Sequence, residues 1–325
     1  MSVTTTQSVP APVVDQLDRS ATFHVAGHRG LVGSAIWRHL ESQGFTALLG
    51  RSSADLDLRA RDQVFDYYAE NRPRYAILAA AKVGGIMANS TCPADFLSDN
   101  LRIQVNVLDA AAAFGVERLL FLGSSCIYPK HAPQPLKEEY LLTGALEPSN
   151  DAYAIAKIAG ILHVQALRRQ RGVRFISAMP TNMYGPNDNF DLETSHVLPA
   201  MIRKFHDAKV AGLDQVTLWG SGAPRREFLY ADDLARACLM LLERYDEAET
   251  INVGTGEDVS IAELAGTVAE VVGFAGGIAW DSGKPDGTPR KLLDVSRISA
   301  VGWRYETSLR AGIEATYHWY EDRLP

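Results

Sequence analysis

The chain has 325 residues, of which 46% are hydrophobic and 22% are charged, as is usual for a soluble globular protein with one large α/β domain or a domain with an appendage. Its formal net charge of -7 supplies no field that would gather a polyanion, so we expect no nucleic acid partner. No apolar run is long enough to cross a bilayer, and we expect no membrane span.

The three cysteines, Cys92, Cys126 and Cys238, are odd in number and far apart, and they lack the close spacing of a zinc site or a redox pair. We therefore expect no metal and a cytoplasmic, reducing location. Cys92 and Cys238 are interpreted as structural. Residues 1–20 have no basic start followed by an apolar core, so they are predicted to form a flexible N-terminal tail and not a signal peptide.

From Ala21 onward, short apolar segments alternate with helix-length amphipathic segments. This alternation predicts βαβ units and a parallel sheet that is covered on both faces. We expect a Rossmann-type, doubly wound α/β domain over residues 21–180. Residues 181–325 are predicted to form mainly a smaller C-terminal α/β lobe that binds the substrate, with some segments free to return to the first domain. Within this lobe, Ser260 is the expected N-cap of a helix.

The first predicted strand is followed by AGHRGLVGSAI, whose three glycines have the spacing GxxGxxG at the start of a predicted helix. Glycine lets the chain turn tightly and lets backbone amides approach a pyrophosphate. A glycine triplet is weak evidence by itself, but its place between a strand and a helix favours dinucleotide binding over a plain turn. The residues of this loop that we expect to bind the cofactor are Gly27, Arg29, Gly30, Leu31, Val32 and Gly33.

The end of the second predicted strand distinguishes NAD from NADP, because an acid there binds the ribose 2′-hydroxyl and an arginine accommodates a 2′-phosphate. The chain reads LLGRSS, with Arg51 at the deciding position, no acid before Asp55, and Arg29 as a second positive charge. The alternative is that Arg51 is only a solvated strand end. We expect NADP(H), with Asp57 and Leu58 beside the adenine.

The segment YAIAK places Tyr153 and Lys157 four residues apart, so that both lie on one face of a predicted helix. A lysine ammonium beside a phenol favours the phenolate, and a tyrosine so tuned can exchange a proton with a carbonyl or alcohol oxygen. Ser124, just past an apolar strand, is placed to hydrogen-bond the same oxygen. An isolated YxxxK is more often a surface pair, and the glycine loop and the serine weigh against that alternative.

GxxGxxG, Ser124 and YxxxK together resemble the extended short-chain dehydrogenase/reductases. Longer segments, of which GSSCIYPK and KPDGTPRKLLD are the most specific, resemble the GDP-L-fucose synthase branch of that family over essentially the whole chain except the tail. The resemblance implies an NADPH-dependent oxidoreductase and epimerase. Its substrate would be the GDP-sugar GDP-4-keto-6-deoxy-D-mannose, which is epimerised at C3 and C5 and then reduced by hydride at C4 to GDP-L-fucose.

The resemblance also implies a role for each site residue. Cys126 would take a proton from the sugar ring and His196 would deliver one to the other face. Tyr153 and Ser124 would stabilise the enolate oxygen and then, with Lys157, support the reduction. Without the resemblance, Cys126 would be interpreted as a small core residue and His196 as a residue near a helix cap.

The GDP moiety needs cations in an otherwise acidic protein. Arg226 is the best candidate for the diphosphate and Lys291 is another, since charged hydrogen bonds fix phosphate strongly. Each could instead be half of a surface ion pair. The resemblance adds Lys204, where some relatives carry arginine, and Trp219 to the expected substrate-binding residues.

Several alternatives remain open at this point. A colitose-type synthase would act on a GDP-4-keto-3,6-dideoxy sugar and invert only C5. A 4,6-dehydratase is disfavoured because Ser125 and Cys126 stand where acids are expected, and an epimerase that recycles NAD is disfavoured by Arg51. A non-catalytic, nucleotide-sensing Rossmann protein would lack a proton donor, and none is missing. The family further implies a homodimer, formed by residues 93–114 and 152–169.

Overall fold

The structure is a computed structural model in which residues 16–284 and 286–324 are described. Residues 1–15 of the expected N-terminal tail lie outside the described residues. The rest of that segment contacts the folded chain, because Leu17 is 3% exposed and belongs to a hydrophobic core cluster.

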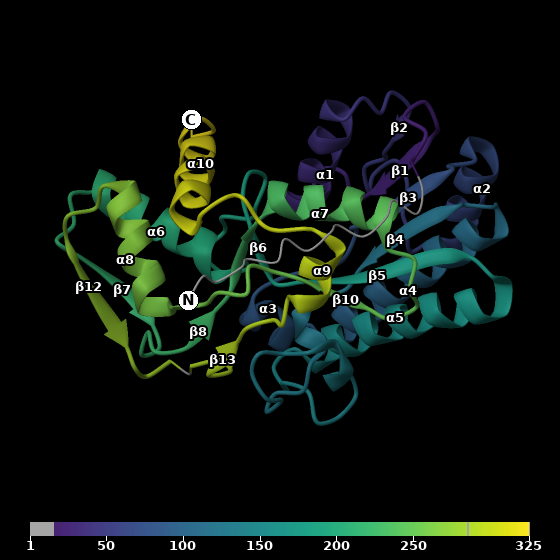
Figure 1. The fold of residues 1–325 in the computed structure, drawn as a ribbon. Helices are drawn as coiled ribbons and strands as arrows, with labels where there is room; N and C mark the ends of the chain where they lie inside the picture. The colour runs from purple at the N-terminus through teal and green to yellow at the C-terminus, as the bar shows by residue number, and fades with distance from the viewer. Residues whose placement is uncertain (1–15, 285, 325) are drawn as a thin grey trace, which may run out of the picture.

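A six-stranded sheet in the order β10-β5-β4-β3-β1-β2 forms the first part of the molecule, and each pairing between neighbours is parallel (Figure 1). The predicted doubly wound α/β sheet is therefore confirmed. Its last strand, β10, comes from beyond residue 180. The six strands are β1 (Phe23–Ala26), β2 (Leu48–Leu49), β3 (Tyr75–Leu78), β4 (Arg118–Leu122), β5 (Arg174–Pro180) and β10 (Ile251–Val253).

Alternate residues of the central strands pack on opposite faces of the sheet, as the pleat requires. In β4, Leu120 and Leu122 join the core cluster that includes α1 and α7, whereas Leu119 and Phe121 join the cluster that includes α2, α4 and α5. These helices are α1 (Leu31–Ser42), α2 (Arg61–Asn71), α4 (Pro93–Ala113), α5 (Asp151–Arg171) and α7 (Ala231–Arg244).

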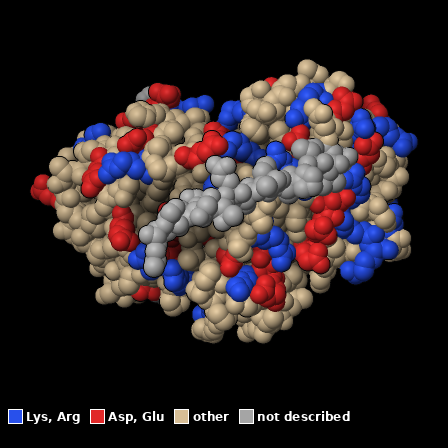
Figure 2. Space-filling model, in the orientation of Figure 1, with Lys and Arg blue, Asp and Glu red and all other residues tan. Residues whose placement is uncertain are grey.

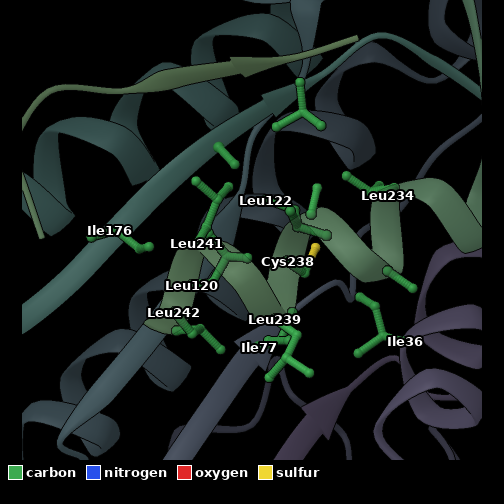
Figure 3. Packing of buried hydrophobic residues seen from close by; sticks show 14 of the residues in the cluster. Ile36, Ile77, Leu120, Leu122, Ile176, Leu234, Cys238, Leu239, Leu241 and Leu242 are labelled. Atoms are coloured by element: carbon green, nitrogen blue, oxygen red, sulfur yellow. The ribbon is translucent and has the colours of Figure 1, made fainter. Parts of the chain in front are cut away.

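Cys238 lies within the first of these clusters. It has 0% exposure and packs among leucines of β4 and α7 (Figure 3). The expected structural role of Cys238 is thus confirmed. Cys92, for which the sequence predicts the same role, lies between α3 (Ile86–Thr91) and α4 and is exposed, so it is not a core residue.

The order in which the chain adds strands to the sheet reverses between β1 and β3. From β1 the chain continues to β2 on one side, and from β3 it continues to β4 and β5 on the other. At such a reversal, the loops after the strands diverge and leave a crevice at the carboxyl ends, where α/β proteins bind ligands. The glycine loop follows β1, so the fold places it at this crevice.

The second part of the molecule is a smaller lobe with its own core cluster, to which α6, α8 and α10 contribute. Ser260 is the N-cap of α8, as expected, and forms a capping box with Glu263. The helices of this part are α6 (Val197–Val210), α8 (Ile261–Val272) and α10 (Leu309–Glu321). A further helix, α9 (Ser296–Val301), lies near β10 (Figure 1).

Among the described residues, short strands outside the six-stranded sheet form three small sheets. β6 (Asn182–Tyr184) pairs with β9 (Phe228–Tyr230), and β7 (Gln215–Trp219) pairs with β12 (Gly277–Asp281). A further three-stranded sheet has the order β11-β8-β13. Its strands are β11 (Val259–Ser260), β8 (Arg225–Arg226) and β13 (Arg290–Lys291). The described residues also include the 3-10 helices η1 (Ser125–Ile127) and η2 (Glu138–Tyr140).

Charges of both signs are interspersed over the face shown in Figure 2, as the modest net charge of -7 suggests. Among the described residues, no helix is long and apolar enough to span a membrane. The same residues contain no group of three or more His, Cys, Asp or Glu side chains that could hold a metal ion.

Candidate active site

The glycine loop fits a pyrophosphate group. Gly27 has φ +86°, a conformation that favours glycine, and a Cβ on Gly33 would lie 2.0 Å from the carbonyl oxygen of Gly27. Gly30 is the N-cap of α1 and offers no side chain to cap the helix. The first backbone N–H groups of α1, to which Leu31, Val32 and Gly33 belong, are thus left for an anionic ligand.

Two cations border this loop. Arg29 and Arg51 are both exposed, and neither has an ion-pair partner within 4.0 Å among the residues described. Both charges act on the same neighbours. Both lower the pKa of His28, after burial as the largest cause, and both contribute to the lowered pKa of Asp55, whose largest cause is a hydrogen bond from Ser52. The pair suits a 2′-phosphate, in agreement with the prediction of NADP(H).

Asp57 and Leu58, expected beside the adenine, are held by local contacts. The carboxylate of Asp57 accepts hydrogen bonds from Nε of Arg59 at 2.9 Å and from its Nη2 at 3.0 Å. The carbonyl of Leu58 accepts a hydrogen bond from Asn106 at 3.0 Å. The Asp57 carboxylate therefore already has a cationic partner, which the sequence pattern did not indicate.

Ser124, Tyr153 and Lys157, which we call the tyrosine cluster, come together where β4 ends and α5 begins. Ser124 caps η1 by accepting a hydrogen bond from the backbone N–H of Cys126 at 3.3 Å. Its side chain also forms a hydrogen bond with that of Tyr153. The structure thus unites the three residues that the YxxxK spacing and the strand end predicted.

Lys157 is buried, with 3% exposure. Its ammonium donates a hydrogen bond to the carbonyl of Leu122 at 2.8 Å and lies 5.8 Å from the centroid of the Tyr153 ring. Burial lowers the pKa of Lys157 to about 8, because a charged ammonium loses hydration there.

The pKa of Tyr153 changes in the direction opposite to the one predicted from the neighbouring lysine. Burial raises it, the charge of Cys126 raises it further, and the hydrogen bond with Ser124 only partly opposes them. Lys157 is held at a main-chain carbonyl and does not contribute to this shift. A raised pKa keeps the phenol protonated, which suits a group that donates a proton to a carbonyl oxygen.

Cys126, Asn150, Arg226 and Lys291 form a second group, which we call the thiol cluster. The amide of Asn150 donates a hydrogen bond to Sγ of Cys126 at 3.3 Å, and Nζ of Lys291 lies 3.8 Å from the same sulfur. Cys126 is a free, half-buried cysteine. Lys291, expected to bind the diphosphate, is therefore in contact with the thiol.

Arg226 is the other cation of the thiol cluster. Burial lowers its pKa, and the negative charges of Cys126, Asp286 and Glu147 act in the opposite direction. Its Nη1 donates to the carbonyl of Arg225 at 2.8 Å. Strand β8 lies beside β13, in register Arg226 with Lys291, so sheet pairing places the two cations side by side.

Sequence reasoning missed Asn150 and Glu147. Burial would raise the pKa of Glu147, but hydrogen bonds that include one from Lys130 hold it below its usual range. Glu147 pairs with Lys130 at 3.1 Å and accepts a hydrogen bond from Thr288 at 3.2 Å. It thereby anchors the turn that carries Asn150. Asn150 occupies the N-cap of α5 without capping it, and no local pattern shows that its amide turns to a thiol.

His196 lies at the N-cap of α6. The residue as a whole is exposed to solvent. The pKa of His196 is nevertheless lowered, because nearby protein atoms reduce the hydration of its imidazole. The preceding turn rests on the loop after β3, where a Cβ on Gly85 would lie 2.7 Å from the carbonyl oxygen of Ser195. Within the described part of the chain, no hydrogen bond joins the His196 side chain to the thiol cluster.

Lys204 and Trp219 lie together in the second lobe. Nζ of Lys204 is 5.6 Å from the centroid of the Trp219 ring, and Nζ of Lys284 is 5.2 Å from it. Burial lowers the pKa of Lys204, while Trp219 is 53% exposed. An exposed indole between two ammonium groups is a surface on which a planar, negatively charged ligand can be held.

Residues 23–254 match the NAD dependent epimerase/dehydratase family. The chain is 57% identical to GDP-L-fucose synthase 1 of Arabidopsis thaliana over 97% of each chain. It is 37% identical to the GDP-L-colitose synthase of Yersinia pseudotuberculosis, over 91% of this chain and 96% of that one. A solved GDP-L-fucose synthetase from Naegleria fowleri bound to NADP has 30% identity and a TM-score of 0.87, covering 96% of this chain and 98% of its own.

Proposed function

The chain belongs to the NAD dependent epimerase/dehydratase family, and we propose that it converts GDP-4-keto-6-deoxy-D-mannose to GDP-L-fucose with NADPH. The observation that carries the proposal is the free thiol of Cys126 in contact with Asn150 and Lys291, adjacent to the Ser124 and Tyr153 pair. A reductase alone needs only the tyrosine cluster. A thiol supplied with its own hydrogen-bond donors serves an additional proton transfer.

Epimerisation precedes reduction because the C4 ketone acidifies the protons on C3 and C5. Cys126 takes a proton from the ring, and Lys291 and Arg226 stabilise the negative charge on its sulfur. The enolate oxygen at C4 is stabilised by hydrogen bonds from Tyr153 and Ser124. After the carbon is protonated on its other face, the configuration is inverted.

His196 delivers the proton on that other face. Its pKa is lowered by burial, so the imidazole is protonated less readily than in water. The negative charges of a bound GDP-sugar favour the protonated form and oppose the effect of burial. This assignment of His196 rests on the family resemblance, since its side chain has no hydrogen bond to the thiol cluster among the residues described.

The reduction uses the tyrosine cluster. The glycine loop would hold NADPH, with Arg29 and Arg51 at its 2′-phosphate, and the chemistry that the bound cofactor would supply is a hydride for C4. Tyr153, kept protonated by its raised pKa, donates its proton to the C4 oxygen. Lys157, which is fixed beside the Tyr153 ring by its hydrogen bond to the Leu122 carbonyl, would hold the cofactor next to Tyr153.

The remaining cations and the exposed indole hold the GDP moiety. Arg226 and Lys291 lie in the thiol cluster. When the sugar ring is bound at Cys126, the diphosphate attached to the ring is therefore within reach of these two cations. Lys204 and Trp219 are proposed to bind the nucleotide farther along the second lobe.

The test is to supply the protein with GDP-4-keto-6-deoxy-D-mannose and NADPH in deuterated water, following NADPH absorbance and the product by proton NMR. We expect GDP-L-fucose with deuterium at C3 and C5. NADPH oxidation that yields a sugar not inverted at these carbons would contradict the epimerase activity. A GDP-4-keto-3,6-dideoxy sugar serves as the competing substrate, and a strong preference for it would favour the colitose-type activity.

We also propose a homodimer in the cytoplasm. Val105 of α4, with Ile155 and Leu162 of α5, expose apolar side chains on two helices that pack against each other. A second copy of the chain would cover them in a two-fold arrangement. Light scattering is expected to give twice the mass of the chain for the natural protein, and the mass of one chain for Ile155→Asp. The three free cysteines suit a reducing compartment.

A further inference from the structure

The imidazole of His28 occupies an unusual position between the glycine loop and the second strand. His28 directly precedes Arg29. A Cβ on Gly50 would lie 2.6 Å from Cγ of the His28 ring, 2.8 Å from its Nδ1 and 2.9 Å from its Cδ2. The ring therefore lies against the main chain of Gly50, which directly precedes Arg51.

Gly50 is required by this contact and not by its own backbone conformation. It is absent from the glycines with positive φ, so an alanine there would adopt the same backbone without strain. The Cβ of an alanine at this position would clash with the His28 ring, because the three distances are shorter than ordinary carbon contacts. The sequence LLGRSS thus contains a glycine whose role is to admit His28.

Among the described residues, the imidazole is held by packing and not by a hydrogen bond at Nδ1. It contacts the indole of Trp37 on α1, with ring centroids 5.2 Å apart at an angle of 45°. Its Nδ1 is shielded from solvent and has no hydrogen-bond partner in the part of the chain that is described. Any displacement of the ring is therefore opposed by the contacts with Trp37 and Gly50 and by no hydrogen bond at Nδ1.

Each arginine of the proposed phosphate site directly follows one of the two residues in contact, Arg29 after His28 and Arg51 after Gly50. Burial lowers the pKa of His28 first, and the charges of Arg29 and Arg51 lower it further. The lowered pKa favours the uncharged imidazole, which lies between two segments that each carry a guanidinium without an ion-pair partner among the described residues. Two like charges repel each other, and a rigid contact between their segments opposes movement of the two arginines apart.

We infer that His28 is a positioning residue for cofactor selectivity: by packing between Trp37 and Gly50, it fixes Arg29 and Arg51 around the 2′-phosphate of NADP(H). The inference rests on the proposed cofactor. It concerns the difference between two dinucleotides that share every group except this phosphate. Loss of the contact therefore lowers affinity for the phosphorylated form and leaves the other unchanged.

The experiment is a double-mutant cycle of Gly50→Ala and His28→Ala, with binding of NADP+ and NAD+ measured by calorimetry and no sugar present. Gly50→Ala is expected to weaken NADP+ binding about tenfold, or about 1.4 kcal/mol, with NAD+ binding unchanged. In the His28→Ala background the same substitution is expected to change NADP+ binding less than about twofold, because the ring that it displaces is gone.

Gly266→Ala is the matched control. Gly266 lies in α8, and a Cβ there would meet nothing within 4 Å. This variant should keep both affinities, and its melting temperature should be equal to or slightly above that of the natural protein because alanine favours the helix. Melting temperatures of the other variants show whether they fold.

Two results would overturn the inference. One is an equal loss of NADP+ affinity from Gly50→Ala with and without His28, and the other is an equal loss for NADP+ and NAD+. Because no sugar is present, failure of the proposed fucose chemistry leaves the cycle unaffected. Equal affinity of the natural protein for NADP+ and NAD+ would instead contradict the cofactor proposal itself, and with it the inference.

Discussion

The tyrosine cluster and the thiol cluster lie next to each other, but the chain builds them in different ways. Ser124, Tyr153 and Lys157 come from the end of one strand and the first turns of one helix. The thiol cluster draws on η1, the turn before α5, and strands β8 and β13 of the second lobe. The tyrosine cluster therefore depends on one strand and one helix, whereas the thiol cluster also depends on strands that are far from Cys126 in the sequence.

The comparison assigns one chemistry to each cluster. If reduction belongs to the tyrosine cluster and the C–H proton transfers to the thiol cluster, then variants in each should separate the two activities.

Tyr153→Phe removes the proton donor to C4. We expect NADPH oxidation to fall by on the order of 10³-fold, within the range for loss of a general acid. Exchange of the C3 and C5 protons with solvent should slow but persist, because Ser124 still reaches the oxygen. The measurement is NADPH absorbance together with NMR of the keto-sugar in deuterated water. NADPH oxidation at the natural rate would remove Tyr153 from the proposed mechanism.

Cys126→Ser replaces the thiol by a hydroxyl that is much harder to deprotonate. We expect deuterium incorporation at C3 and C5 to fall by roughly 10²-fold, with unchanged NADPH affinity. Cys92→Ser, at an exposed cysteine outside both clusters, is the control and should exchange normally. If both variants exchanged at the natural rate, the thiol would have no part in epimerisation.

Lys157→Met tests the cost of the buried ammonium. The pKa of Lys157 falls from 10.5 to about 8, so between these pH values the unfolded chain binds more protons and the stability of the natural protein rises with pH. Below pH 8 the penalty is fully present, at most about 3 kcal/mol. We expect Lys157→Met to be the more stable protein at pH 7.

Urea unfolding of both proteins between pH 7 and pH 10 measures this difference. The advantage of the variant should shrink as the pH rises above about 8. A constant difference across the range would mean that Lys157 is not destabilised by burial. We expect the same variant to lose turnover, which would show that Lys157 serves function at a cost in stability.

Asn150→Ala removes one donor to the thiol. We expect proton exchange at C3 and C5 to fall about tenfold, as for one hydrogen bond to a charged group, with little change in the reduction of a simple ketone by NADPH. Asn71→Ala, at the end of α2, is the control, since its amide donates only to a main-chain carbonyl within its own helix. Equal effects of Asn150→Ala on exchange and reduction would argue against separate clusters.

The sequence predicted the parts of the molecule that depend on local pattern. The strand and helix alternation predicted the parallel sheet, the glycine spacing predicted the tight loop before α1, and Ser260 predicted the N-cap of α8. The four-residue spacing of Tyr153 and Lys157 placed them on one face. Each of these rests on the geometry of one turn, strand or helix.

The rest depends on tertiary contacts that no local pattern contains. Lys291 reaches Cys126 because β13 pairs with β8, which joins segments about 65 residues apart in a sheet. The direction of the Tyr153 pKa shift depends on burial and on the charge of Cys126. The contact of His28 with Gly50 requires β2 to lie beside β1.

The most direct test of the separation is solvent exchange of the C3 and C5 protons of GDP-4-keto-6-deoxy-D-mannose, followed by NMR in Tyr153→Phe and Cys126→Ser side by side. The account predicts that Tyr153→Phe exchanges both protons without reducing the sugar, while Cys126→Ser exchanges them at least tenfold more slowly than Tyr153→Phe. Exchange in Cys126→Ser as fast as in the natural protein would contradict it.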